Sequence, residues 1–394
     1  MADAHNYLVP EYFSGFSCKG GSCRTTCCSG WGISISMGEY FRLLGLTCPP
    51  DLRRKLDCAF HPVDNPTPDR YAQITPNWLG KCPLHMDNGL CQLHAECGEE
   101  ALPAVCRMYP RGAHTEFARE CSCANSCERV LEMLFEMKEP MRFEEKELSL
   151  GLPEAEVDAE NPAVGFYRPV RRLIFEALQN RKYGIPERMA LIGGMLRLLN
   201  EAFKDGESWI ISGAVEVCKA MTPPALPKKD ERLILRTAYR LCRMFSKNAS
   251  VEEIIAEAMS RLGFSLEEEP DDRQLDAAAE IFSTDAVRFG SLFPEWQRLF
   301  EQMLVNHVFF ACFPFSARHE TLWDEYMALC AVCVFVRFIA VTGMTGREGK
   351  ERLIDLCASA FRLIDHSAFD RNAAALLRAK GNTSFEEMIG ITMA

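Results

Sequence analysis

The segment FSCKGGSCRTTCCSGW, residues 16–31, carries four cysteines in the pattern Cys18-x4-Cys23-x3-Cys27-Cys28. Glycines before and after the later cysteines allow the backbone to turn tightly around a bound ion. Thiolates at this spacing suit zinc or an iron–sulfur cluster, because both take several sulfur ligands. Neighbouring residues seldom reach one ion together, so the adjacent pair indicates a cluster, a second site or one cysteine that is not a ligand.

Two later segments carry further cysteines. They read KCPLHMDNGLCQLHAECGEEALPAVCRMYPRG at residues 81–112 and CSCANSCERV at residues 121–130. In the first of them, the run Asp87-Asn88-Gly89 between Cys82 and Cys91 is a turn signal. We therefore expect this turn to bring the two thiols together. Cys106 follows in the same segment, and Cys127 precedes an amphipathic stretch that predicts a helix.

The cysteines are concentrated near one end of the chain, since thirteen of the nineteen lie between Cys18 and Cys127. The first residues lack the features of a secretory signal, so we expect a cytoplasmic protein in which dense cysteine indicates metal rather than disulfides. Three histidines, His85, His94 and His114, are candidate additional ligands, although a histidine there is more often structural. The six later cysteines sit in apolar helical patterns and are expected to be buried free thiols. They are Cys218, Cys242, Cys312, Cys330, Cys333 and Cys357.

A length of 394 residues predicts two domains, and helical periodicity over most of the second predicts a mainly α fold. Residues 1–137 are rich in Cys, Gly and Pro and predict an irregular, cysteine-rich metal-binding domain. Residues 138–162 mix acidic residues with Pro and Gly, which is typical of a linker. Residues 163–394 show apolar positions at helical spacing and predict an all-helical domain. Its clearest helical patterns, beyond those near residues 170–178 and 189–199, lie at about 229–246, 250–262, 293–312, 317–342 and 347–364.

The net charge and the hydropathy of the chain indicate which kinds of partner it does not bind. A formal net charge of -11 argues against nucleic acid, because proteins bind phosphate backbones mainly through Lys and Arg. The one long apolar run, from Met327 to Met344, contains Arg337 and is near the lower length limit for crossing a bilayer. We expect a buried helix there and no membrane partner.

Two motifs of known methyl-transfer enzymes are missing. A radical S-adenosylmethionine site needs C-x3-C-x2-C, but Gly30 stands where the third cysteine would follow Cys27. No predicted strand is followed by GxGxG, so a Rossmann-type methyltransferase domain is not supported.

The sequence resembles the flagellin lysine-N-methylase family in the stretches FSCKGGSCRTTCCSGWGISI, CPLHMDNGLCQLHAECGEEALPAVCRMYPR and NSCERV, and more loosely in NHVFFACFPFS, residues 306–316. The likeness covers most of the chain, with firm motifs in about its first third. It implies methyl transfer from S-adenosylmethionine to lysines of flagellin, with an iron–sulfur cluster of the 4Fe–4S type or, alternatively, zinc. Matched by position, the implied metal ligands are Cys18, Cys23, Cys27, Cys28, Cys82, Cys91, Cys106 and Cys127. The family pattern lacks Cys48, Cys58, Cys97, Cys121 and Cys123.

Methylation of lysine makes modest chemical demands. The amine must be neutral to attack a methyl group, and a sulfonium donor needs aromatic or acidic surroundings. Trp31, Tyr109, Glu99 and Glu100 lie near the cysteines in sequence, although packing or solvation is their commoner role. The alternative function is a noncatalytic metal-binding or redox-sensing protein. A long helical domain favours the enzyme, with that domain recognising the protein substrate.

Overall fold

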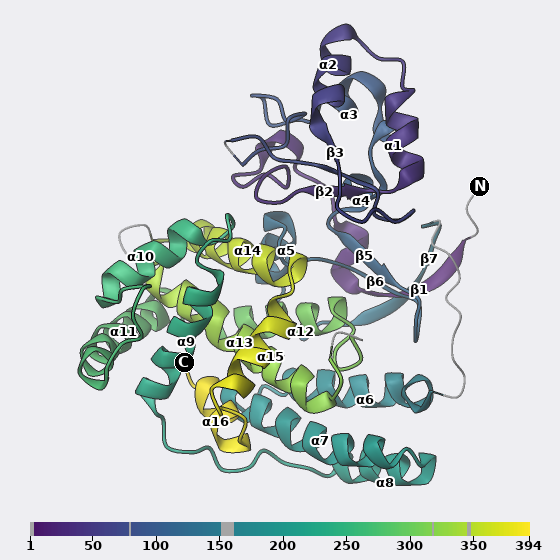
Figure 1. Cartoon of the computed structure of the whole chain (residues 1–394). Coiled ribbons are helices and arrows are strands. Elements are labelled where there is room, and N and C mark those ends of the chain that lie inside the picture. The colour runs from purple at the N-terminus through teal and green to yellow at the C-terminus, as the bar shows by residue number, and fades with distance from the viewer. Residues whose placement is uncertain (1–3, 79, 151–160, 317–318, 345–347) are drawn as a thin grey trace.

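The computed structural model describes residues 4–78, 80–150, 161–316, 319–344 and 348–394. These ranges contain sixteen α-helices, and the eleven that follow residue 160 form one helical body below a smaller N-terminal domain (Figure 1). The mainly α class and the all-helical C-terminal part are therefore confirmed. The helices of that part are α6 (Pro162–Leu178), α7 (Ile185–Asp205), α8 (Ser208–Lys219), α9 (Glu231–Phe245), α10 (Glu252–Leu262), α11 (Asp272–Leu292), α12 (Trp296–Phe310), α13 (Leu322–Thr342), α14 (Lys350–His366), α15 (Phe369–Ala379) and α16 (Phe385–Ile391).

The helical body is built around α13, which packs against α7, α9, α14 and α15. By length and composition α13 could cross a membrane, but all of its most apolar stretch is buried inside the fold. The predicted buried helix is thus confirmed. Arg337, the charged residue within the apolar run from Met327, lies over the ring of Trp296 at 3.9 Å, and burial lowers the pKa of Arg337 to about 9. The first residues of the helical patterns expected at 317–342 and 347–364 lie outside the described residues.

Within the described residues, the N-terminal part contains two sheets and five α-helices. A four-stranded sheet has the order β5-β6-β1-β7, in which β1 is parallel to β6 and antiparallel to β7. A three-stranded antiparallel sheet has the order β2-β4-β3. The strands are β1 (His5–Pro10), β2 (Ile33–Ile35), β3 (Phe60–Pro62), β4 (Ala72–Ile74), β5 (Arg111–His114), β6 (Glu120–Cys123) and β7 (Phe143–Leu148). The helices are α1 (Met37–Leu44), α2 (Pro50–Ala59), α3 (Gln92–Cys97), α4 (Ala104–Met108) and α5 (Glu128–Glu136).

Two hydrophobic cores divide the chain. The smaller core lies within residues 35–102, and we call residues 17–110 the small domain. The larger core joins the helical body to β1, β6 and α5, whose Tyr7, Val130 and Leu134 are buried in it. Helix α5 packs against both α12 and α14. The boundary expected at residue 137 therefore falls inside the larger core, which contains both Phe135 and Met141.

The segment 138–162, expected to be a linker, contains strand β7. This strand pairs with β1 over six residues, from Phe143 opposite Pro10 to Leu148 opposite His5. Its sequence, FEEKEL, is too polar to show an apolar pattern, and the strand forms because the edge of β1 offers backbone hydrogen bonds. Residues 151–160 of the expected linker lie outside the described residues.

A buried ion pair connects the four-stranded sheet with the helical body. The Arg171 guanidinium of α6 donates to the Glu120 carboxylate of β6 at 2.8 Å, and these side chains are 2% and 3% exposed. The same guanidinium donates to the carbonyls of Phe313 at 2.6 Å and Val308 at 3.2 Å. The hydroxyl of Tyr167 donates to Glu120 at 2.8 Å. This joint fixes β6, and hence the segment that leads to Cys127, against the helices.

Candidate metal centre

Seven of the eight expected ligand cysteines line a single cavity of about 200 Å³ in the small domain. They are Cys18, Cys23, Cys27, Cys28, Cys82, Cys91 and Cys106. The eighth, Cys127, is the N-cap residue of α5. In the described part of the chain, no three His, Cys, Asp or Glu side chains converge tightly enough to hold a single ion. That these cysteines bind metal stays a prediction, and the fold brings seven of them around one space.

Ion pairs hold the first cysteine loop against α5. Lys19 donates to Glu128 at 2.6 Å and to Glu132 at 2.8 Å. The Thr25 backbone N–H donates to the same Glu128 carboxylate at 3.0 Å. Glu128 directly follows Cys127, and its side chain is only 1% exposed. The anchor therefore brings the loop of residues 18–27 to the N-terminus of α5.

Backbone contacts hold the second cysteine segment against the first. The Cys82 N–H donates to the Cys28 carbonyl at 2.7 Å. The turn predicted between Cys82 and Cys91 is present, because the Gly89 N–H donates to Met86 at 2.9 Å and residues 85 and 91 pair beyond it. Gly89 has φ 81°, and a Cβ there would lie 2.7 Å from the Cα of Gly21. Two glycines are thus needed where the two segments touch.

The thiols lie in surroundings that disfavour their charged form. Burial raises the pKa of Cys23 to about 11, and the Glu128 carboxylate adds to that shift. Burial raises the pKa of Cys82 to about 12, although the backbone N–H groups of Leu84 and His85 oppose the rise. A cation among these sulfurs would reverse the balance, since it favours thiolates.

The adjacent pair Cys27-Cys28 shares a hydrogen bond between its two thiols. This bond raises the pKa of Cys27 and lowers that of Cys28. The Thr26 hydroxyl and the Arg362 guanidinium further lower the pKa of Cys28, whereas nearby thiols raise that of Cys27, so the two side chains have different surroundings. A helix terminus acts on Cys127, where burial raises the thiol pKa while the backbone N–H groups of Val130 and Arg129 oppose the rise.

The three histidines expected as additional ligands have different positions. His94 lines the cavity, and the Nε2 atom of His85 is buried without a hydrogen-bond partner among the described residues. The Nε2 atom of His114 instead shares a hydrogen bond with the Phe310 carbonyl at 2.8 Å, which is a structural role. The five cysteines absent from the family pattern do not line the cavity. The six later cysteines are all buried, as predicted.

Aromatic side chains form the wall of the cavity that faces the helical body. Trp31 and Tyr109 both line the cavity, and the ring of Trp31 lies 4.7 Å from that of His366 in α14. The Ser126 hydroxyl bonds to the Tyr109 hydroxyl at 3.1 Å and to His366 Nε2 at 2.8 Å. Arg362 of α14 lies over Trp31 and donates to the Thr25 carbonyl. Nothing in the local sequence marks these α14 residues as part of the site, since more than 200 residues separate them from the cysteines.

The acidic candidates do not join this wall. Glu99 and Glu100 are exposed and do not line the cavity. Glu100 instead pairs with Arg107 at 2.9 Å, which is the neighbour pairing expected of a surface arginine.

The motif NHVFFACFPFS supports the cysteine segment from the helical body. Asn306 is fully buried, and its amide donates to the Cys123 carbonyl at 2.8 Å and to the Asn125 side chain at 2.7 Å. The Tyr12 hydroxyl donates to Asn306 at 2.6 Å. These bonds fix the turn that immediately precedes Cys127. The loose resemblance at 306–316 therefore has a structural meaning, since this stretch braces the N-terminal region.

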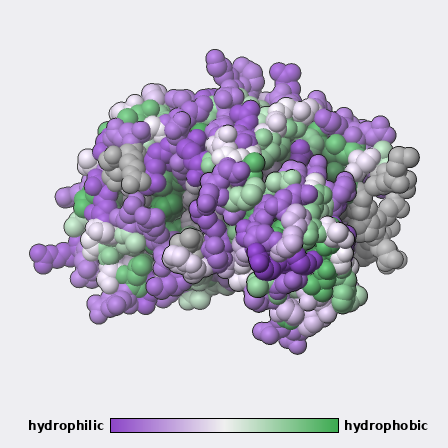
Figure 2. All heavy atoms as spheres, turned by 90° about the horizontal axis from the view of Figure 1, so that it is seen from above, coloured by the Kyte–Doolittle hydropathy of each residue, from purple (hydrophilic) through white to green (hydrophobic). Residues whose placement is uncertain are grey.

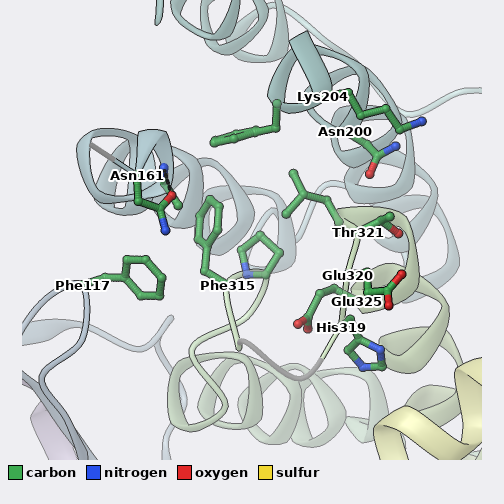
Figure 3. A pocket seen from close by; sticks show the side chains of 13 residues that line it. Phe117, Asn161, Asn200, Lys204, Phe315, His319, Glu320, Thr321 and Glu325 are labelled. Atoms are coloured by element: carbon green, nitrogen blue, oxygen red, sulfur yellow. Dashed lines mark hydrogen bonds between the residues drawn. The ribbon is translucent and has the colours of Figure 1, made fainter. Parts of the chain in front are cut away.

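A second cavity, of about 420 Å³, lies in the helical body beside the loop between β5 and β6. Figure 3 shows Phe117 and Phe315 on one side of it and the polar side chains of Asn200, Thr321 and Glu325 on the other. Its wall thus combines aromatic rings with two carboxylates, those of Glu320 and Glu325. Seen from the side of the small domain, the surface is largely hydrophilic with separate apolar patches (Figure 2).

Comparisons with known proteins agree on one family. The sequence model of the FliB lysine N-methylase C-terminal domain matches residues 171–391, which are more than half of the chain. A protein named Lysine-N-methylase from Salmonella typhimurium is 27% identical over 141 residues, or 35% of this chain and 34% of that protein. The Flagellar biosynthetic protein FliU of Salmonella muenchen is 28% identical over 107 residues, or 27% of this chain and 62% of that protein. The chain therefore spans about a third of the length of the curated lysine-N-methylase that it matches. No solved structure is significantly similar.

Proposed function

Since this chain belongs to the FliB lysine N-methylase family, we propose that it methylates lysine side chains of flagellin, with S-adenosylmethionine as the donor and an iron–sulfur cluster as cofactor. The observation that carries the proposal is the combination of that family's helical domain with a cavity lined by seven cysteines. The relatives named for lysine methylation and for flagellar biosynthesis support the reaction and the substrate. A cytoplasmic location belongs to the same proposal, because free thiols persist in a reducing compartment.

The donor set and the cavity fit an iron–sulfur cluster. Thiolates are the usual ligands of such clusters. A zinc ion bonds each thiolate at about 2.3 Å, which leaves no free volume between the sulfurs. A cavity of about 200 Å³ among the cysteines leaves room for iron and inorganic sulfide, and this favours the cluster over zinc. When bound, an iron–sulfur cluster supplies electron-transfer chemistry at a potential set by its surroundings.

The transfer itself requires a neutral lysine amine. Its nitrogen lone pair forms the bond to the methyl carbon while the carbon–sulfur bond breaks, the donor leaves as a neutral thioether, and the methylated nitrogen then loses a proton. Burial raises the pKa of Tyr109 well above its ordinary value, which favours the neutral phenol over the phenolate. Trp31 and Tyr109 offer aromatic faces to a cationic donor.

The helical body is the proposed site of substrate recognition. A lysine side chain has an apolar stem and a cationic end, so it suits a site with apolar walls and a carboxylate. The second cavity has these features, with Phe203 and Phe315 among its apolar residues, and two carboxylates, Glu320 and Glu325, against one cation, Lys204. The Ser316 hydroxyl donates to Glu325, which orients that carboxylate.

The test is a methylation assay with purified full-length protein, S-adenosylmethionine and flagellin, with intact-mass detection of one added CH2 group per methyl. We expect methylation by the natural chain and by Cys58→Ser, whose thiol is exposed and outside the cavity. We expect none from Cys82→Ser. Metal binding without any methylation would favour the alternative of a noncatalytic metal-binding or redox-sensing protein.

A further inference from the structure

The eight cysteines divide into two sets of four. We call the first the junction set, because it lies where the small domain meets α5. It contains Cys18, Cys23, Cys27 and Cys127. We call the second the inner set, because three of its members pack against the core of the small domain. It contains Cys28, Cys82, Cys91 and Cys106.

The junction set is held together by contacts between the first loop and α5. The Lys19–Glu128 pair at 2.6 Å and the Thr25–Glu128 bond at 3.0 Å place the loop beside the residue that follows Cys127. Cys18 and Cys127 both act electrostatically on Cys23, and both act on Cys27 as well. Cys18 and Cys127 are thus thiol neighbours of both Cys23 and Cys27.

The inner set is held together by the backbone of the small domain. The Cys82 N–H bonds to the Cys28 carbonyl, and the turn at Gly89 returns the chain to Cys91. Helix α4, which packs against β2, supplies Cys106. The thiol of Cys106 has those of Cys28, Cys82 and Cys91 as its thiol neighbours.

The division falls between two adjacent residues. Cys27 has its other thiol neighbours in the junction set, whereas Cys82, Cys91 and Cys106 all have Cys28 as a neighbour. One peptide unit thus supplies a thiol to each set. This resolves the geometric difficulty of an adjacent pair, since neither ion nor cluster has to accept both side chains.

We propose that the two sets hold two separate metal centres, each with four thiolate ligands. Four thiolates complete the coordination of one zinc ion or of one [4Fe–4S] cluster. The identity of the metal as iron and sulfide rests on the proposed function, whereas the number of centres rests on the arrangement of the cysteines alone.

The test counts metal in full-length protein prepared without oxygen. Two [4Fe–4S] clusters give about eight iron and eight sulfide per chain, and one cluster gives about four. Cys27→Ala and Cys28→Ala are each expected to remove half of the metal, and the double variant is expected to remove all of it. Cys23→Ala combined with Cys27→Ala is expected to remove no more than either change alone, because both residues belong to one set. Cys58→Ala is the matched control.

The count from the natural chain decides the matter even where a variant fails to fold. About four iron per chain, or complete loss of metal from both folded single variants, would overturn the inference. Two zinc ions without sulfide, one lost from each single variant, would uphold two centres and overturn the iron–sulfur part of the proposed function. A full metal content without methylation would count against the proposed enzyme alone.

Discussion

Replacing Arg171 by Met tests whether the joint between the sheet and the helical body is electrostatic. Met retains much of the aliphatic volume of Arg171 but removes the charge that faces Glu120 at 2.8 Å. It also removes the donors to the carbonyls of Phe313 and Val308. Glu120 then remains in the core with the Tyr167 hydroxyl as its remaining partner.

The expected cost is large because neither side chain is accessible to water. Removing one partner of a buried ion pair typically costs about 3–5 kcal/mol, since the other charge is left uncompensated. Arg172→Met is the matched control. Arg172 pairs with Glu176 on the surface, where the side chains are 81% and 58% exposed, and an exposed pair is worth about 0–1 kcal/mol.

The cost should also depend on pH. Burial raises the pKa of Glu120, and the charge of Arg171 opposes that rise. Without Arg171 the carboxyl pKa rises further, so the protonated form becomes the tolerated one. A group whose folded pKa is raised contributes most below its ordinary pKa and loses that contribution as pH rises through the folded value. The variant should therefore be penalised less at about pH 5.5 than at about pH 8.

The assay is urea unfolding of the natural chain and both variants at the two pH values, followed by helical circular dichroism. Arg171→Met combined with Glu120→Gln should recover part of the lost free energy of unfolding, because no buried charge remains. The reasoning is refuted if Arg171→Met costs no more than Arg172→Met, or if its cost grows as the pH falls.

Three further predictions concern the cysteine region. Gly89→Ala should lower the free energy of unfolding by about 1–3 kcal/mol, because its φ is positive, and should also lower the metal content. Gly38→Ala is the control, since its added methyl meets nothing within 4 Å, and it should change neither quantity. Equal metal content of the two variants by elemental analysis would contradict this. Asn306→Ala should lower the free energy of unfolding, measured in urea, by about 1–3 kcal/mol, because the buried Cys123 carbonyl loses its amide donor. A loss smaller than half of the lower value would contradict the supporting role of Asn306. Cys82→Ser should lower metal content while Cys330→Ser, fully buried in α13, leaves it unchanged, and equal losses would contradict the division between site and core cysteines.

The cysteine region could be predicted from local sequence where short-range geometry decides it. The turn at residues 87–89 was predicted from three residue types, and the fold has it. The buried helix α13 was predicted from a continuous apolar run. Both features depend on neighbours in sequence, whose side chains determine the backbone with little help from distant contacts.

Features that depend on distant contacts could not be predicted in this way. Strand β7 is polar and exists because β1 lies beside it. Helices α8, α11, α15 and α16 were missed, and α11 has several alanines where an apolar pattern would need larger residues. The contacts of His366 and Arg362 with Trp31 join residues more than 300 positions apart, and nothing in either local stretch marks them.

The hydrogen bonds of Asn306 have a consequence for recombination between related proteins. The chain leaves the large core near residue 17 and re-enters it near residue 110, so a transplant between relatives would move the small domain as one piece. Such a transplant carries all four cysteines of the inner set, but it leaves Cys127 behind with the recipient's helices. The recipient would then have to supply both Cys127 and the asparagine that holds the turn before it. The junction set is thus completed by two parts of the protein that recombination would separate, and hybrids with an unmatched helical half should lose that set first.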